Sequence, residues 1–239
     1  MDRLTVVTFS AGWGLASKGP FALKLLKWLD VAGVPYRQTF EDQAGKGPKG
    51  KNPWIELDGR AIGDTEIIIE LLARRSNFDI DAGLDARERA RSHTVRRMLE
   101  EHFHQVLEWE LFVHPEGAES VRQTVRQLAP ALVADLIASR YCGHFARQLK
   151  ARGIARHDDA TIAKKGREDL DAFEALLGGG PYFLGDRISM ADVSAYGLLS
   201  PMARWPMRTP VADDLKGRTV IMAYLDRMQA LKADVPRAA

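Results

Sequence analysis

The sequence predicts a protein of two unlike halves: an α/β half over residues 1–78, followed by an all-helical half over residues 84–239. In the first half, short β-branched and aromatic runs alternate with helical patterns. Beyond Asn77 the short runs stop, and long charged and apolar helical patterns take their place. The chain has 239 residues, of which 46% are hydrophobic and 28% charged, which is the composition of an ordinary globular protein.

The first half opens with a strand, a loop and a helix. Residues 4–9 form a β-branched and aromatic run that predicts a strand. Residues 20–32 place apolar side chains at helical spacing, with proline at the first position and Gly33 at the end. A second strand is expected over residues 34–40. The crossover between these two strands should be right-handed.

A hairpin and a helix complete this half. Strands are expected over residues 54–57 and 60–62, since Asp58-Gly59 favours the tight turn between them. Thr65 is expected to cap a helix that runs to Arg75. The order strand, helix, strand and then hairpin, helix is that of a thioredoxin-like domain.

The second half reads as helix throughout. Residues 86–112 predict one long helix and residues 161–177 predict another. Between them, residues 121–151 predict a helix that is broken near Pro130 and Gly143. Ser189 to Asp192 has the pattern of a capping box at the start of a further helix, to which we assign a structural role.

Charge and cysteine content narrow the classes of partner and compartment. A net charge of +2 is too small to attract nucleic acid or an anionic membrane over a distance, so neither is expected as a partner. The single cysteine, Cys142, cannot form an internal disulfide, which favours a cytoplasmic location. We find neither a signal-peptide pattern nor an apolar run of about 18 residues.

Three backbone features of the first half could hold a ligand. A helix starts at Pro20, where free amides favour an anion. Asn52-Pro53-Trp54 enters a strand beside the hairpin, and a cis bond there would turn the preceding backbone outward toward an extended peptide. Asp64-Thr65 precedes a helix whose free amides could hold a carboxylate. Each feature alone is more often purely structural, so it is their joint presence that predicts a ligand site.

Four stretches resemble the glutathione transferase superfamily, and within it the failed-axon-connections and metaxin-like branch, to which many bacterial proteins also belong. They are GPFALKLLKWLDVAGVPYR, GPKGKNPWIELDGRAIGDTEIIIELL, ARGIARHDD and PYFLGDRISMADVSAYGLL, spread from Gly19 to Leu199. The second and fourth are the more diagnostic. The resemblance implies a two-domain architecture with a glutathione-binding cleft on the first domain.

The resemblance also implies binding residues. Pro53 matches the cis proline of the family, and the backbone of Trp54 would pair with the cysteinyl part of glutathione. Asp64 and Thr65 match the residues that hold the γ-glutamyl end. Threonine replaces the more usual serine and keeps its hydroxyl.

The thiol-activating position is altered in this chain. Gly19 falls where related branches carry serine or cysteine, so the side chain expected to steady the sulfur is absent. The Ser17 hydroxyl, the Lys18 ammonium and Ser10 are the alternative candidates, because each could favour the thiolate by hydrogen bonding or proximity. Trp13 could wall the cleft or simply anchor its loop.

No metal is expected. His102 and His104 lie on different faces of their helix, and His104 with Glu108 makes only a pair.

Two classes of function follow. The first is a glutathione transferase that presents the glutathione thiolate to a small electrophile, as in detoxification. The second is a non-catalytic binding or scaffold protein of the same fold, which Gly19 and the metaxin-like resemblance both allow. Glutathione-dependent isomerisation or dehalogenation would use the same site. Glutathione and the electrophile are the expected partners, and the superfamily also allows a homodimer.

Overall fold

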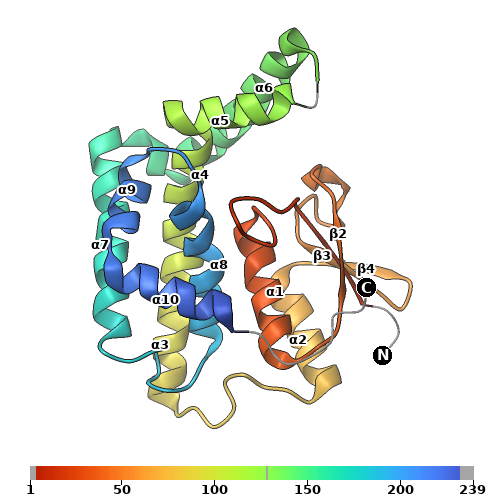
Figure 1. Cartoon of the computed structure of the whole chain (residues 1–239), viewed down its shortest axis with the longest axis vertical. Coiled ribbons are helices and arrows are strands. Elements are labelled where there is room, and N and C mark those ends of the chain that lie inside the picture. Colours follow the sequence, from red (N-terminus) through yellow and green to blue (C-terminus); the bar gives the residue numbers. More distant parts are fainter. Residues whose placement is uncertain (1–3, 128, 232–239) are drawn as a thin grey trace.

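A four-stranded mixed sheet lies beside a bundle of helices in the computed structural model, which describes residues 4–127 and 129–231 (Figure 1). The strand order is β2-β1-β3-β4, with β1 and β2 parallel and the other neighbours antiparallel. The strands are β1 (Thr5–Thr8), β2 (Arg37–Phe40), β3 (Trp54–Leu57) and β4 (Arg60–Gly63).

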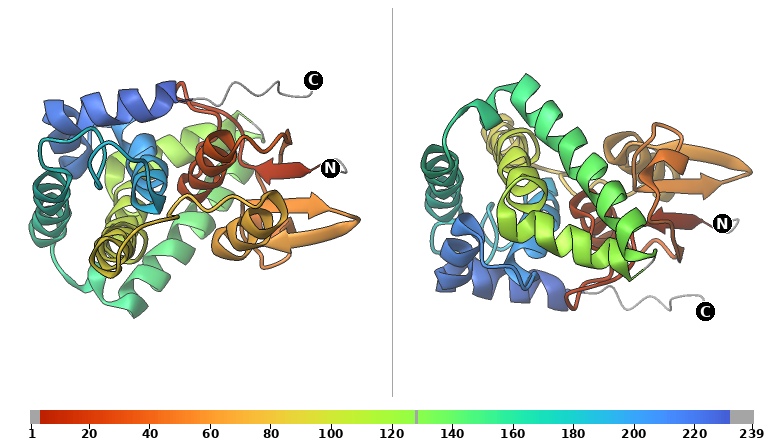
Figure 2. Two further views of the ribbon diagram at one scale, coloured as in Figure 1. Left: turned by 90° about the horizontal axis from the view of Figure 1, so that it is seen from below. Right: turned by 90° about the horizontal axis from the view of Figure 1, so that it is seen from above.

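Helices α1 (Pro20–Ala32) and α2 (Thr65–Ser76) lie on the side of the sheet that is turned toward the other helices (Figure 2). Side chains of the sheet such as Val6 and Ile55 pack in one core with Leu25 of α1 and Ile68 of α2. The apolar positions that predict these elements are therefore the ones that hold them together. The predicted α/β half with thioredoxin-like order is confirmed.

Helix α1 is buried on two sides, so that every residue from Ala22 to Leu29 is buried. The sheet covers one side and α8 (Met190–Arg204) covers the other. The two helices approach closely at Gly197, where a Cβ atom would lie 2.7 Å from the carbonyl oxygen of Pro20. A larger residue at this position would push α8 away from α1.

The second half is helical, as predicted. A continuous run is formed by α3 (Ala86–Arg97), a π-helical segment η2 (Met98–Phe103) and α4 (His104–Phe112). Next, α5 (Pro115–Arg126) and α6 (Ala131–Arg152) form an arm beyond the bundle (Figure 1). The remaining elements are η1 (Ala44–Lys46), η3 (Ile154–Arg156), α7 (Asp159–Leu177), α9 (Pro210–Gly217) and α10 (Thr219–Ala230).

Three local predictions are wrong. The break at Pro130 is present, but α6 continues through Gly143, because glycine inside a helix costs only about 1 kcal/mol relative to alanine. The second strand begins at Arg37, since Pro35 has no amide to donate to a neighbouring strand. The N-cap of α2 is Asp64, whose carboxylate accepts a hydrogen bond from the Glu66 amide, and Thr65 is the first helical residue.

The start of α8 is confirmed. Helix α8 begins at Met190, and the Asp192 carboxylate accepts a hydrogen bond from the Ser189 amide at 2.8 Å. The Ser189 hydroxyl donates to the same carboxylate at 2.7 Å. None of the described helices is both long and apolar enough to cross a membrane.

Candidate functional site

Three segments singled out in the sequence meet at one end of the sheet. Trp54, the first residue of β3, lies opposite Val7 of β1 on one side and Gly63 of β4 on the other. The loop after β1, the Asn52–Pro53 bond before β3 and the start of α2 after β4 therefore adjoin one another. This sheet register assembles a site from residues that are far apart in the chain.

The loop between β1 and α1 is shaped by internal hydrogen bonds. The Lys18 amide donates to the Ser10 carbonyl at 3.1 Å. The fully buried Ser17 hydroxyl donates to the Phe9 carbonyl at 2.9 Å and accepts from the Gly19 amide at 3.2 Å. Both hydrogen-bonding functions of the Ser17 hydroxyl are thus engaged by the backbone of its own loop.

Ser10 is paired with a carboxylate. Its hydroxyl donates to Asp42 at 2.6 Å, and its amide donates to the other oxygen of Asp42 at 2.9 Å. Burial alone would raise the pKa of Asp42, but these two hydrogen bonds and the nearby Lys18 charge hold that pKa below its ordinary value. The half-buried Lys18 side chain packs its stem over Gly12, and its charge acts on the Asp42 carboxylate.

Gly19 is the N-cap of α1 and is closely covered. A Cβ atom on this residue would lie 2.8 Å from Cδ2 of the Phe9 ring. A serine or cysteine at this position would therefore require the ring to move. The aromatic side chain at the end of β1 occupies the space that a thiol-steadying side chain would need.

Trp13 connects its loop to the helical half. Its ring is 6.3 Å from that of Trp205, in an edge-to-face arrangement. Trp205 is buried, whereas Trp13 is partly exposed. The loop-anchoring role is thus present in the structure, and a role as a cleft wall stays a prediction.

The Asn52–Pro53 peptide bond is cis, and Pro53 is buried. The Asn52 side-chain amide donates to the Glu41 carbonyl at 2.5 Å, which fixes the loop before β3. Trp54 is half-buried, and its indole nitrogen has no hydrogen-bond partner among the described residues. The contact of its backbone with a ligand stays a prediction.

Asp64 and Thr65 form the start of α2. Asp64 has a positive φ of 84° and an exposed side chain, which also lies 3.4 Å from the Lys49 ammonium. Thr65 is 7% exposed. The site thus offers a carboxylate, a hydroxyl and the amides of a helix start, which together suit a ligand carrying both an ammonium and a carboxylate.

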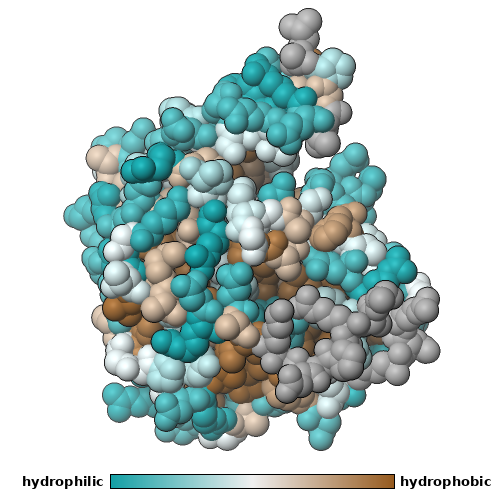
Figure 3. Space-filling view, in the orientation of Figure 1, coloured by the Kyte–Doolittle hydropathy of each residue, from teal (hydrophilic) through white to brown (hydrophobic). Residues whose placement is uncertain are grey.

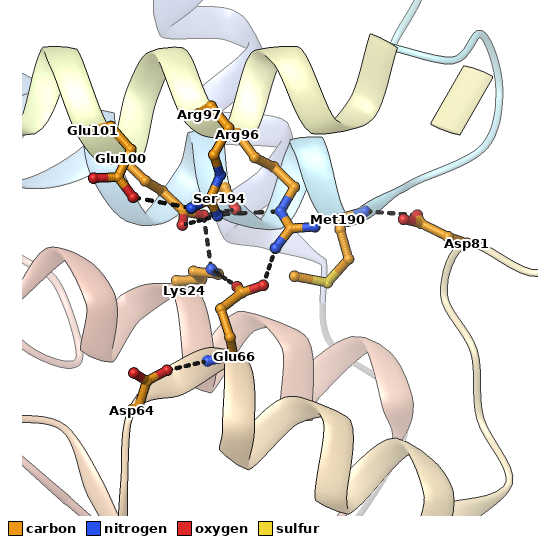
Figure 4. A network of polar contacts seen from close by, with 10 residues as sticks. All are labelled: Lys24, Asp64, Glu66, Asp81, Arg96, Arg97, Glu100, Glu101, Met190 and Ser194. Atoms are coloured by element: carbon orange, nitrogen blue, oxygen red, sulfur yellow. Dashed lines mark hydrogen bonds and ion pairs between the residues drawn. The ribbon is translucent and has the colours of Figure 1, made fainter. Parts of the chain in front are cut away.

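An ion network joins this start of α2 to the helical half, and our reading of the sequence missed it. The fully buried Lys24 ammonium contacts the Glu66 carboxylate and donates to Glu100 at 2.7 Å (Figure 4). Arg96 contacts the second oxygen of Glu66, and the Ser194 hydroxyl donates to Glu100 at 2.6 Å. The available signal was the lysine itself, which interrupts the apolar run of α1.

Glu66 makes stability depend on pH. Burial raises the pKa of its carboxyl, but Lys24 and Arg96 outweigh that effect and lower the pKa from 4.5 to about 2. Because the folded-state pKa is depressed, the contribution is present above about pH 4.5 and is lost as the pH falls toward 2.

We expect Glu66→Gln to lower the free energy of unfolding at pH 7 by about 1 to 2 kcal/mol. This loss stays below the free energy that corresponds to the full pKa shift, because the Glu66 side chain is 44% exposed and solvent screens its charge. Urea unfolding at pH 7 and pH 3 measures the effect. The deficit should shrink at pH 3. Glu70→Gln, which breaks an exposed ion pair with Arg74 on the same helix, is the control. An equal deficit at both pH values contradicts this role.

The candidate metal residues lie in separate contacts. His102 pairs with Asp169 at 2.6 Å, and this hydrogen bond raises the pKa of His102. His104 contacts the ring of Phe21, and Arg152 donates to the Glu108 carboxylate at 2.8 Å. Across residues 4–127 and 129–231, no group of three or more His, Cys, Asp or Glu side chains is arranged to hold a metal ion.

Family models match almost the whole described chain. The model of the glutathione S-transferase N-terminal domain matches residues 20–117, and that of the glutathione S-transferase C-terminal domain matches residues 121–227. A crystal structure of a glutathione S-transferase from Methylobacterium radiotolerans, complexed with glutathione sulfonate, superposes with a TM-score of 0.59. It shares 18% identity and covers 99% of this chain and 96% of its own, so it supports the fold alone.

Three relatives share sequence over most of the chain. An isoprene-epoxide–glutathione S-transferase from a Rhodococcus strain is 25% identical over 95% of this chain and 98% of its own length. Failed axon connections from Drosophila melanogaster is 29% identical over 84% of this chain, and metaxin-3 from Xenopus laevis is 25% identical over 81%. The matches span only 50% of the former protein and 65% of the latter. The resemblance to this branch is confirmed.

Proposed function

This chain belongs to the glutathione S-transferase family, and from that premise we propose that it binds glutathione at the end of the sheet and presents the thiolate to a small electrophile. The observation that carries the proposal is the sheet register, in which Trp54 lies between Val7 and Gly63. This register brings together the start of α1, the cis Asn52–Pro53 bond and the start of α2.

The tripeptide would lie across these three segments. Its γ-glutamyl carboxylate would contact the Thr65 hydroxyl and the free amides of α2, and its ammonium would face Asp64. Its cysteinyl part would pair with the backbone around Pro53 and Trp54. Trp13, in the loop between β1 and α1, would form a wall of the cleft. The exposed Asp64 carboxylate and the positive helix start support this direction of binding.

Lys18 is the candidate that we favour for steadying the thiolate. The Ser17 and Ser10 hydroxyls already donate to the Phe9 carbonyl and to Asp42. An ammonium near the sulfur would favour the charged form and lower the pKa of the glutathione thiol. The start of α1 would act in the same direction through its dipole.

Thr65→Ala should weaken glutathione binding by about tenfold, because a hydrogen bond to a charged carboxylate contributes about 1.5 kcal/mol. Isothermal titration calorimetry of the unaltered and altered chains measures the loss. Thr94→Ala, which removes an exposed hydroxyl of α3 that bonds only its own helix, is the matched control. Equal affinity of Thr65→Ala and the unaltered chain contradicts this assignment.

A second candidate function is a non-catalytic binding or scaffold role. The packing of Phe9 over Gly19 and the similarity to failed axon connections favour it. The two functions differ in one readout, since only the enzyme conjugates glutathione to 1-chloro-2,4-dinitrobenzene. The name of the Rhodococcus relative supports the transferase and a small electrophile such as an epoxide.

We further propose a cytoplasmic detoxifying role and a domain boundary between residues 78 and 84.

The family also allows a homodimer. Sedimentation equilibrium separates the 26.6 kDa monomer from an assembly of twice that mass.

A further inference from the structure

A histidine of the helical half contacts the first turn of α1. His104, the first residue of α4, has its ring centroid 5.0 Å from that of Phe21 in an edge-to-face contact. Phe21 is the second residue of α1, two positions after Gly19. Lys51 of the loop before Pro53 is close enough to act electrostatically on His104. The imidazole thus lies beside the first turn of α1, where the proposed function places the thiol, and its side chain is 19% exposed.

The surroundings favour the neutral form of this imidazole. Burial lowers the pKa of His104, and the charges facing it are those of Glu108 on α4, Arg152 on α6, Lys51 and Glu101. His104 Nε2 lies 3.9 Å from Glu108 Oε1, which is beyond hydrogen-bonding distance, and the other Glu108 oxygen is taken by Arg152. A neutral imidazole has one nitrogen that can accept a proton and one that can donate.

Three side chains of α4 and α6 form an aromatic wall. The rings of Phe112 and Phe145 are stacked at 3.9 Å, and Tyr141 meets both edge to face. The Lys51 ammonium lies 5.8 Å from the centre of the Phe145 ring, so the wall faces the loop before Pro53. In Figure 3 the outline of the molecule is hollowed between the arm of α5 and α6 and the sheet half. Such a wall suits an aromatic substituent.

We infer that His104 carries the thiol proton of glutathione to the oxygen of an aryl-substituted epoxide held against this wall. The inference rests on the proposed function. The imidazole accepts the thiol proton while sulfur forms a bond to an epoxide carbon. The C–O bond breaks with its electron pair on oxygen, and the imidazolium returns the proton to that oxygen. The products are a thioether and an alcohol, and no charge is gained or lost.

The loop between β1 and α1 supplies no hydroxyl for this proton transfer. Gly19 has no side chain, and the hydroxyls of Ser17 and Ser10 donate elsewhere. An epoxide expels an unstable alkoxide, so a proton delivered to its oxygen accelerates the opening, whereas an aryl chloride releases chloride without one. His104 would therefore matter for the first class of electrophile far more than for the second. Lys18 can steady the thiolate in the reaction with either class of electrophile.

The test compares His104→Asn with His93→Asn, an exposed histidine of the preceding helix α3. Glutathione affinity should change by less than about twofold, and kcat/KM for styrene oxide should fall about 100-fold or more. Conjugation of 1-chloro-2,4-dinitrobenzene at about pH 9, where much of the thiol is ionised without a base, should change by less than about threefold. His93→Asn should leave all three quantities unchanged.

Two results overturn the inference. Equal losses with styrene oxide and the aryl chloride at about pH 9 would show that His104 only supports the structure. Unchanged turnover of styrene oxide in His104→Asn would exclude proton transfer by this residue. Failure of the unaltered chain to bind glutathione would instead contradict the proposed function, so the two failures are distinguishable.

Discussion

Lys24→Met should lower the free energy of unfolding by about 3 kcal/mol, because it leaves the buried Glu100 carboxylate without its closest cation. The Lys24 side chain is fully buried and that of Glu100 is 5% exposed. Breaking a buried ion pair costs about 3 to 5 kcal/mol. We expect the lower end, since Arg97 and the Ser194 hydroxyl still contact Glu100. Chemical denaturation at pH 7 measures the change.

A double variant separates the loss of the pair from the loss of packing. Lys24→Met with Glu100→Gln removes the stranded charge, so it should recover about 1 kcal/mol or more of the loss. Lys164→Met, whose side chain is 73% exposed, is the matched control and should change stability by less than about 0.5 kcal/mol. A single variant as stable as the control would show that the network does not hold the two halves together.

Asp192→Ala should destabilise the protein by about 3 to 5 kcal/mol. A helix cap alone contributes about 0.5 to 2 kcal/mol. The fully buried Asp192 carboxylate also accepts hydrogen bonds from the Phe183 amide and the Tyr224 hydroxyl, both at 3.1 Å. The alanine variant would leave the Phe183 amide, and the amide and hydroxyl of Ser189, without this acceptor. The Tyr224 hydroxyl would keep only the backbone carbonyl of residue 192, at 3.3 Å.

Asp158→Ala provides the comparison for this effect. Asp158 caps α7 by accepting a hydrogen bond from the Thr161 amide at 2.7 Å, and its side chain is exposed. Its loss should cost about 1 kcal/mol. Thermal unfolding of the two variants side by side measures the difference. Equal midpoints would contradict the buried network around Asp192.

Local chemistry made the sheet half predictable from the sequence. The hairpin turn follows from Asp58 and Gly59, which have φ values of 52° and 74° in the structure. The strands beside it follow from their β-branched and aromatic residues. The α2 cap was misassigned because Asp64 and Thr65 are both good capping residues, and their sequence does not distinguish them.

The candidate site was predictable in its backbone but not in its side chains. The helix start at Asp64 follows from a motif of a few neighbouring residues, whereas the cis bond at Pro53 was implied only by the family resemblance. The Phe9 ring over Gly19 and the pairing of Lys24 with Glu100 depend on tertiary packing, which no local pattern encodes. The same holds for His104, whose contact with Phe21 joins the two halves.

A crystal structure of the chain soaked with glutathione tests the central claim most directly. We predict electron density for the tripeptide beside Asn52–Pro53, with its γ-glutamyl carboxylate at Thr65 and its sulfur between the start of α1 and His104. Density for glutathione elsewhere, or an empty groove at saturating glutathione, would contradict the account and leave only the architecture.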